Sequence, residues 1–123
     1  MSNRILLIED EQDIREAMAE GLTESGFEVM TASNGAEGLQ LALTEKPDVI
    51  LLDIIMPEMD GHEMLKKLRT DPWGNKAKVI MLTSMDNAAH VANSYTDSVD
   101  DYIIKVHNSL DEIVNKVKVV LNS

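Results

Sequence analysis

Short apolar runs alternate along the chain with longer segments in which apolar residues recur at helical spacing. Three of the runs are Ile5–Ile8, Val49–Leu52 and Val79–Leu82, and the more alternating segment Phe27–Thr31 follows the first of them. A continuous apolar run is typical of a central strand in a parallel sheet, because helices cover both faces of such a sheet. We expect these segments to be strands, with Asp101–Ile104 as a fifth.

The segments between the strands have the period of amphipathic helices. We expect helices over residues 13–25, 36–45, 62–70, 87–95 and 110–121. Asn34 or Ser33 can cap the second of these helices, and Pro47 ends it. The closing helix has the strongest apolar stripe, whereas the fourth has only small apolar residues to bury. Strands that alternate with helices in this way predict one α/β domain, with a parallel sheet, right-handed crossovers and helices on both faces.

Polar residues stand where four of these strands end. Glu9-Asp10 follows the first strand, Asp53 ends the third, Thr83-Ser84 ends the fourth and Lys105 follows the fifth. Three carboxylates at one edge repel one another unless a cation neutralises them, and their oxygens suit Mg²⁺ better than zinc. A lysine and a hydroxyl beside such a cation offer charge and a hydrogen-bond donor to a phosphoryl group. The pattern therefore predicts a site for phosphoryl transfer.

The composition narrows the possible functions. The chain has 22 acidic and 11 basic residues, a formal net charge of −11, so we expect no direct DNA binding, because phosphate backbones would be repelled. It has no cysteine, which excludes a disulfide framework and a thiolate metal site. No apolar run is long enough for a signal peptide or a membrane span, and we expect a cytoplasmic protein that does not associate with membranes.

Taken together, the motifs at the strand ends resemble the receiver domain of bacterial two-component response regulators, of the chemotaxis-regulator type. The motifs that carry the resemblance are Glu9-Asp10, Leu52–Pro57 with Gly61, Thr83-Ser84 and Asp100–Lys105. The resemblance covers nearly the whole chain and implies a doubly wound, flavodoxin-like fold with five parallel strands in the order 2-1-3-4-5. Because the chain ends with its last helix, we expect a single receiver domain over residues 1–123 with no output domain.

The resemblance also implies the chemistry of the site. Asp53 would be the phosphoacceptor, and its carboxylate would attack a phosphohistidine or a small acyl phosphate. Asp10, Asp53 and the carbonyl of Ile55 would bind Mg²⁺, and Glu9 would support the ion through a water. Such a protein is not a conventional enzyme, since it would catalyse its own phosphorylation and its own dephosphorylation.

By the same resemblance, three further residues would respond to the phosphoryl group. Thr83 and Lys105 would bind it, and Tyr102 would rotate inward behind Thr83. The switched surface would comprise the fourth helix, the fifth strand and the fifth helix. The expected partners are a histidine kinase or phosphotransfer protein and a protein target of unknown identity, and the expected state is a monomer or a weak phosphorylation-dependent dimer.

One position departs from the family pattern. Val106 stands where the family usually has a proline, in a cis bond that helps to aim the lysine. A cis bond costs about 2.5 to 4 kcal/mol before a residue other than proline, so we expect a trans Lys105–Val106 bond and a less restrained lysine. The alternative function is therefore a pseudo-receiver, which is not phosphorylated and serves only as a protein-interaction module.

Two other classes of protein use similar strand ends. A flavodoxin-like electron carrier needs a Ser/Thr/Gly-rich phosphate loop after the first strand, where Glu9-Asp10-Glu11 would instead repel the cofactor. A haloacid-type phosphatase needs a second Asp two residues after the first, where Ile55 stands. The sequence therefore favours the phosphoaccepting receiver over both.

Overall fold

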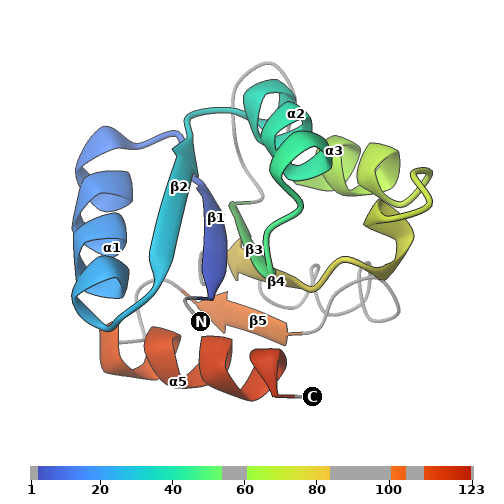
Figure 1. Ribbon diagram of the computed structural model, residues 1–123. Coiled ribbons are helices and arrows are strands. Elements are labelled where there is room, and N and C mark those ends of the chain that lie inside the picture. Colours follow the sequence, from blue (N-terminus) through green and yellow to red (C-terminus); the bar gives the residue numbers. More distant parts are fainter. Residues whose placement is uncertain (1–2, 54–60, 84–100, 105–109, 123) are drawn as a thin grey trace.

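The strands lie in one parallel sheet with helices on either side (Figure 1). The computed structural model describes residues 3–53, 61–83, 101–104 and 110–122. In these ranges the strands are β1 (Arg4–Ile8), β2 (Glu28–Ala32), β3 (Val49–Asp53), β4 (Val79–Thr83) and β5 (Asp101–Ile104). The helices are α1 (Gln12–Glu24), α2 (Gly35–Glu45), α3 (Gly61–Leu68), the short 3-10 helix η1 (Gly74–Lys76) and α5 (Leu110–Leu121). The helix expected over residues 87–95 lies outside the described residues.

The sheet order is β2-β1-β3-β4-β5, and every neighbouring pair is parallel. In the register, Ile8 lies beside Leu52, and Asp53 lies beside Leu82. Because all the strands run the same way, their carboxyl ends lie at one edge of the sheet, and Glu9 follows β1 at the level of Asp53. The predicted α/β class with a parallel sheet is confirmed.

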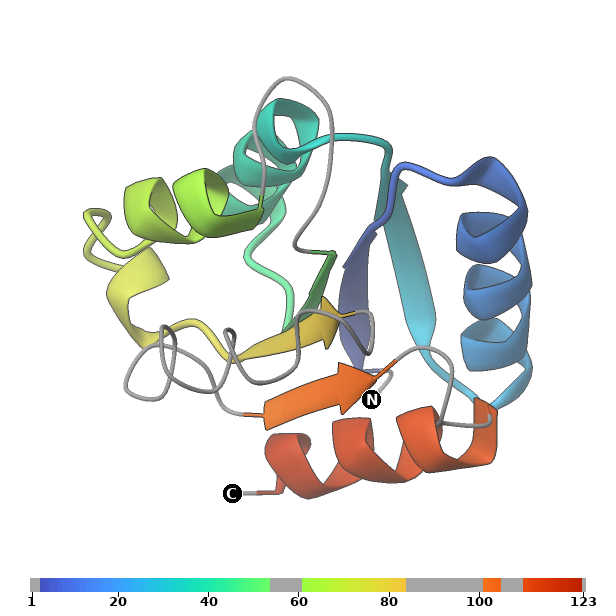
Figure 2. The same cartoon turned by 180° about the vertical axis from the view of Figure 1, so that it is seen from behind.

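Each face of the sheet has its own apolar core. The alternating residues of β1 divide between the two cores: Leu6 and Ile8 face α2 and α3, and Ile5 and Leu7 face α1 and α5. Figure 2, which shows the molecule from behind, has the same arrangement of helices. The four apolar residues of β3 are 0% exposed, as the uninterrupted run Val49–Leu52 predicted. Helices on both faces are thereby confirmed.

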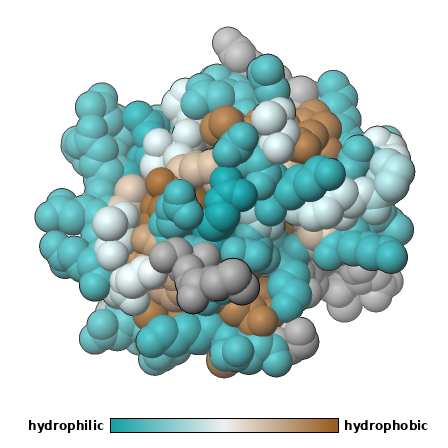
Figure 3. Space-filling view, viewed as in Figure 1, coloured by the Kyte–Doolittle hydropathy of each residue, from teal (hydrophilic) through white to brown (hydrophobic). Residues whose placement is uncertain are grey.

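One face of the molecule is mainly polar. The face in Figure 3 is largely hydrophilic, with apolar side chains in smaller areas between the polar ones. Among the described residues, Val119 on α5 is the large apolar side chain that is exposed, at 66%. No described helix has both the length and the apolar character needed to cross a membrane.

The ends of α2 show one expected feature and one that the sequence did not reveal. Asn34, one of the two residues expected to cap this helix, is the N-cap, and its side chain accepts a hydrogen bond of 2.8 Å from the backbone N–H of Glu37. Pro47 predicted the C-terminal end of α2. There the chain turns at Lys46, whose φ of 48° is left-handed, and Pro47 follows that turn.

Gly38 allows α2 to approach β1 closely, just before the acidic pair. A Cβ at this position would lie 2.7 Å from Cγ1 of Ile8, and Ile8 is 0% exposed. We expect Gly38→Ala to lower the free energy of unfolding by about 1 to 2 kcal/mol, because overpacking outweighs the better helix propensity of alanine. Urea unfolding measures this change.

A double mutant tests the stated cause. Ile8→Val removes Cδ1, the Ile8 atom nearest to the added Cβ. In the Ile8→Val background, Gly38→Ala should therefore cost less than it costs in the wild type. Equal costs in the two backgrounds would show that the contact with Ile8 is not the reason for the glycine.

Candidate functional site

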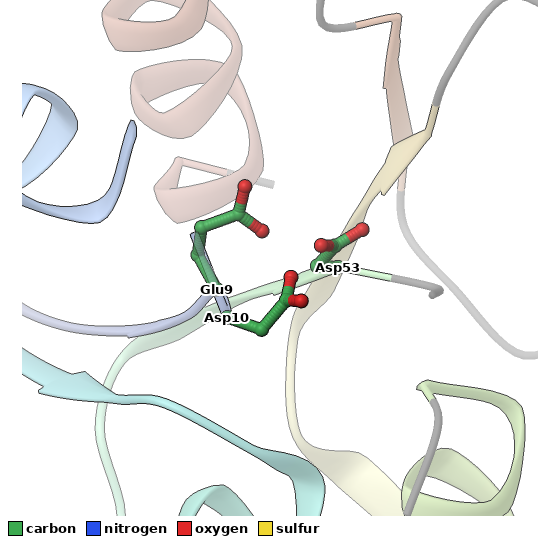
Figure 4. Close-up of side chains that lie close together, drawn as sticks. All are labelled: Glu9, Asp10 and Asp53. Carbon is green, nitrogen blue, oxygen red and sulfur yellow. The ribbon is translucent and has the colours of Figure 1, made fainter. Parts of the chain in front are cut away.

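Three carboxylates meet at the carboxyl edge of the sheet. Glu9 and Asp10 follow β1, and Asp53 ends β3. One oxygen from each lies within 4.8 Å of one from each of the others. Figure 4 shows the carboxylates of Asp10 and Asp53 turned toward each other, with Glu9 beside them. The structure thus brings together the three acidic residues that the sequence singled out.

Backbone pairing places these residues. The N–H of Glu9 donates to the carbonyl of Ala32 at 3.1 Å, so the contact between β1 and β2 continues one residue beyond β1. Glu9 is 0% exposed and Asp53 is 5% exposed, whereas Asp10 is half-buried. The cluster is therefore open to solvent mainly at Asp10.

The donor set of this cluster fits a hard divalent cation. Two unit negative charges 4.8 Å apart repel by roughly 3 kcal/mol at an effective dielectric constant of about 20. A cation among the three carboxylates replaces that repulsion with attraction. The set contains oxygen donors and no sulfur or imidazole nitrogen, which is the ligand chemistry of Mg²⁺ rather than of zinc.

The other predicted site residues are only partly within the described part of the chain. Thr83 ends β4, and its backbone lies beside that of Ile104, the last residue of β5. The backbone of Tyr102 pairs with Met81. Ile55 and Lys105 lie outside the described residues, as do the side chains of Thr83 and Tyr102, and so does the Lys105–Val106 bond. The roles of these residues stay predictions.

Arg15 contacts the acidic pair, and the hydrophobic pattern did not reveal it. Its guanidinium donates to the backbone carbonyl of Glu9 at 2.9 Å and lies 3.4 Å from that of Asp10. The available sequence signal was a single basic residue in α1, a helix that otherwise has acidic and neutral side chains. That signal does not reveal the contact, because an arginine on a helix is usually solvated.

The family follows from comparison with known proteins. A family model described as the response regulator receiver domain matches residues 5–118. The chain belongs to this family. The resemblance inferred from the strand-end motifs is thereby confirmed.

Curated relatives of the receiver domain are longer proteins. Over 121 residues the chain is 37% identical to the alkaline phosphatase synthesis transcriptional regulatory protein PhoP of Bacillus subtilis, covering 98% of the chain and 49% of PhoP. It is 38% identical over 121 residues to the transcriptional regulatory protein SrrA of Staphylococcus aureus, covering 98% of the chain and 48% of SrrA. The chain spans about half the length of these relatives, and the expected absence of an output domain stays a prediction.

Solved receiver structures have the same fold. The chemotaxis response regulator CheY4 of Vibrio cholerae matches with a TM-score of 0.88 and 25% identity, over 98% of this chain and 99% of that one. The response regulator protein TrrA of Thermotoga maritima, solved in complex with Mg²⁺-BeF, matches with a TM-score of 0.82 and 36% identity. That match covers 96% of this chain and 98% of the TrrA chain.

Proposed function

We propose that this receiver domain accepts a phosphoryl group on Asp53 in a Mg²⁺-dependent reaction, as one step of a two-component phosphorelay. The observation that carries the proposal is the convergence of Glu9, Asp10 and Asp53 at the carboxyl edge of the sheet, in a chain that belongs to the receiver family. The complex of TrrA with Mg²⁺-BeF adds support, because TrrA is similar to this chain over nearly its whole length.

Asp53 is the nucleophile in this proposal. One of its carboxylate oxygens bonds to the phosphorus of a phosphohistidine or a small acyl phosphate, while the bond from phosphorus to the donor's nitrogen or oxygen breaks. The electron pair of the broken bond leaves with the donor, and Asp53 becomes an acyl phosphate. The buried position of Asp53, which is 5% exposed, restricts the access of water to this product.

The remaining residues hold the reacting groups. Asp10, Asp53 and the carbonyl of Ile55 would hold Mg²⁺, and Glu9 would support the ion through a water. When bound, Mg²⁺ would supply positive charge to the phosphoryl oxygens. Thr83 and Lys105 bind the transferred phosphoryl group. Tyr102 then rotates inward behind Thr83 and acts as the switch residue.

The signal leaves the domain through a protein-binding surface. We assign this surface to the fourth helix of the family pattern, β5 and α5, and we infer a histidine kinase or a phosphotransfer protein as the phosphodonor. PhoP and SrrA are named as transcriptional regulatory proteins, which favours a protein target that itself acts in regulation. The identity of that target is open. The cytoplasmic location, and the monomer or weak phosphorylation-dependent dimer, belong to the same proposal.

Intact mass spectrometry tests the proposal. The protein is incubated with acetyl phosphate and Mg²⁺, and a gain of about 80 Da is expected from one phosphoryl group. The gain should disappear when EDTA removes the metal. An unmodified mass, with a control receiver phosphorylated by the same reagent, would favour the pseudo-receiver alternative.

In this proposal the Lys105–Val106 segment determines the rate of phosphorylation. With a trans bond and no proline, the lysine is less restrained, so Val106→Pro should speed phosphorylation or prolong the phosphorylated form. Lys105→Ala should slow phosphorylation far more than it weakens Mg²⁺ binding. Time courses of the mass gain measure both effects, and a Val106→Pro variant no faster than the wild type would remove this argument.

A further inference from the structure

Arg15 contacts the backbone of the acidic pair from the first turns of α1. Its guanidinium Nη1 donates to the carbonyl of Glu9 at 2.9 Å and lies 3.4 Å from the carbonyl of Asp10. Its own backbone N–H donates to the carbonyl of Glu11 at 2.9 Å. A single residue thereby interacts with three consecutive carbonyls in the turn that joins β1 to α1.

These carbonyls control where the carboxylates point. The carbonyls of Glu9 and Asp10 belong to the two peptide planes on either side of the Asp10 Cα atom. Since peptide groups are planar, fixing the two carbonyls restricts the backbone dihedrals of Asp10 and the direction of its Cα–Cβ bond. The N–H of Glu9 is already bound to the carbonyl of Ala32, so Arg15 completes the restraint on this turn.

We propose that Arg15 is a positioning residue for the cation site, holding the acidic pair so that the Asp10 carboxylate faces Asp53. The proposal rests on the proposed function, because it assumes that the three carboxylates bind Mg²⁺. Arg15 acts through the backbone of Glu9 and Asp10, and it touches neither the ion nor the phosphoryl group. Groups that orient metal ligands in this way typically contribute 10- to 100-fold to metal affinity.

Loss of the Arg15 charge and loss of its hydrogen bonds should change Mg²⁺ affinity in opposite directions, so the proposal can be tested. A guanidinium beside the site repels a divalent cation, and removing that charge alone would tighten Mg²⁺ binding. Removing the hydrogen bonds to the carbonyls releases the acidic pair and weakens binding. The sign of the change in Mg²⁺ affinity therefore separates the two effects.

The experiment compares Arg15→Met with Arg15→Lys. Methionine keeps much of the apolar stem and removes both the charge and the donors, whereas lysine keeps the charge but has no planar fork. Titration calorimetry with Mg²⁺ should show an affinity about 10-fold weaker for Arg15→Met, and a smaller loss for Arg15→Lys. Should the methionine variant fail to fold, the lysine variant carries the test, since its affinity should still fall below that of the wild type.

Arg69 provides a matched control. It is half-buried like Arg15, and its guanidinium also donates to backbone carbonyls, those of Gly74 and Ala77, each at 2.8 Å. These carbonyls precede β4, at the edge of the sheet opposite the acidic cluster. Arg69→Met should therefore lower stability without changing Mg²⁺ affinity. An equal loss of affinity in Arg15→Met and Arg69→Met would show general destabilisation and overturn the proposal.

A metal-free measurement separates this proposal from the proposed function. In ¹H–¹⁵N spectra without Mg²⁺, Arg15→Met should shift the amide signals of Asp10 and Glu11, which share peptide groups with the two bound carbonyls. Unshifted signals, or an unchanged or tighter Mg²⁺ affinity, would overturn the role of Arg15 alone. A wild type that binds no Mg²⁺ would instead overturn the proposed function, and the amide signals would still report whether Arg15 holds the turn.

Discussion

Asp53→Asn should abolish phosphorylation of this protein and leave its fold in place. An amide oxygen is a poor nucleophile, and asparagine has nearly the same size and shape as aspartate, so the site at the end of β3 stays filled. Asp53 is 5% exposed, and its substitution removes one of three clustered negative charges. We expect the mass gain of about 80 Da to be absent at every time point with acetyl phosphate and Mg²⁺.

Asp48→Asn is the matched control for this variant. Asp48 precedes β3, at the other end of the same strand, and its carboxylate accepts a hydrogen bond of 2.7 Å from the backbone N–H of Arg4. An asparagine there keeps an acceptor oxygen, so phosphorylation should match that of the wild type. If Asp53→Asn still gained the phosphoryl mass, a different residue would be the acceptor.

The sequence could predict those parts of the fold that depend on local pattern. The apolar run of β3 is continuous because helices cover both faces of this strand, so its burial was readable without any coordinates. Asn34 was recognisable as a cap because its side chain needs only the nearby N–H of Glu37. The acidic pair and Asp53 were recognisable because parallel strands bring their carboxyl ends to one edge.

Features that depend on contacts between distant elements could not be predicted in this way. The need for glycine at position 38 arises from its distance to Ile8, which is set by how closely α2 packs on β1. The turn at Lys46 gave no signal, since a left-handed residue there is more often glycine or asparagine. Arg15 acts on carbonyls, which every residue has, so its partners are not encoded in side-chain type.

Asp10→Ala should have opposite effects on metal binding and on metal-free stability. Asp10 contributes one of the three carboxylates, so its loss should abolish measurable Mg²⁺ binding in the calorimeter. In the described part of the chain, no hydrogen bond or ion pair joins the Asp10 side chain to another residue, so its removal leaves none of the described residues without a partner. Without metal the variant should therefore be more stable than the wild type.

The size of this gain in metal-free stability follows from the exposure of Asp10. The repulsion of roughly 3 kcal/mol between charges 4.8 Å apart is screened by solvent at this half-buried residue, which leaves about 1 kcal/mol. The unfolding temperature without metal should then rise by about 3 to 5 °C. With Mg²⁺ present, the order should reverse, because only the wild type gains stability from the bound ion.

Asp13→Ala distinguishes the loss of repulsion among the three carboxylates from a simple change in net charge. Asp13 is exposed in the first turn of α1, where a negative charge is favourable to the helix. Its removal changes the net charge by the same amount as Asp10→Ala but should lower the unfolding temperature slightly and leave Mg²⁺ binding intact. If both variants instead raised the metal-free unfolding temperature equally, the gain would come from the overall charge of −11 and not from the three converging carboxylates.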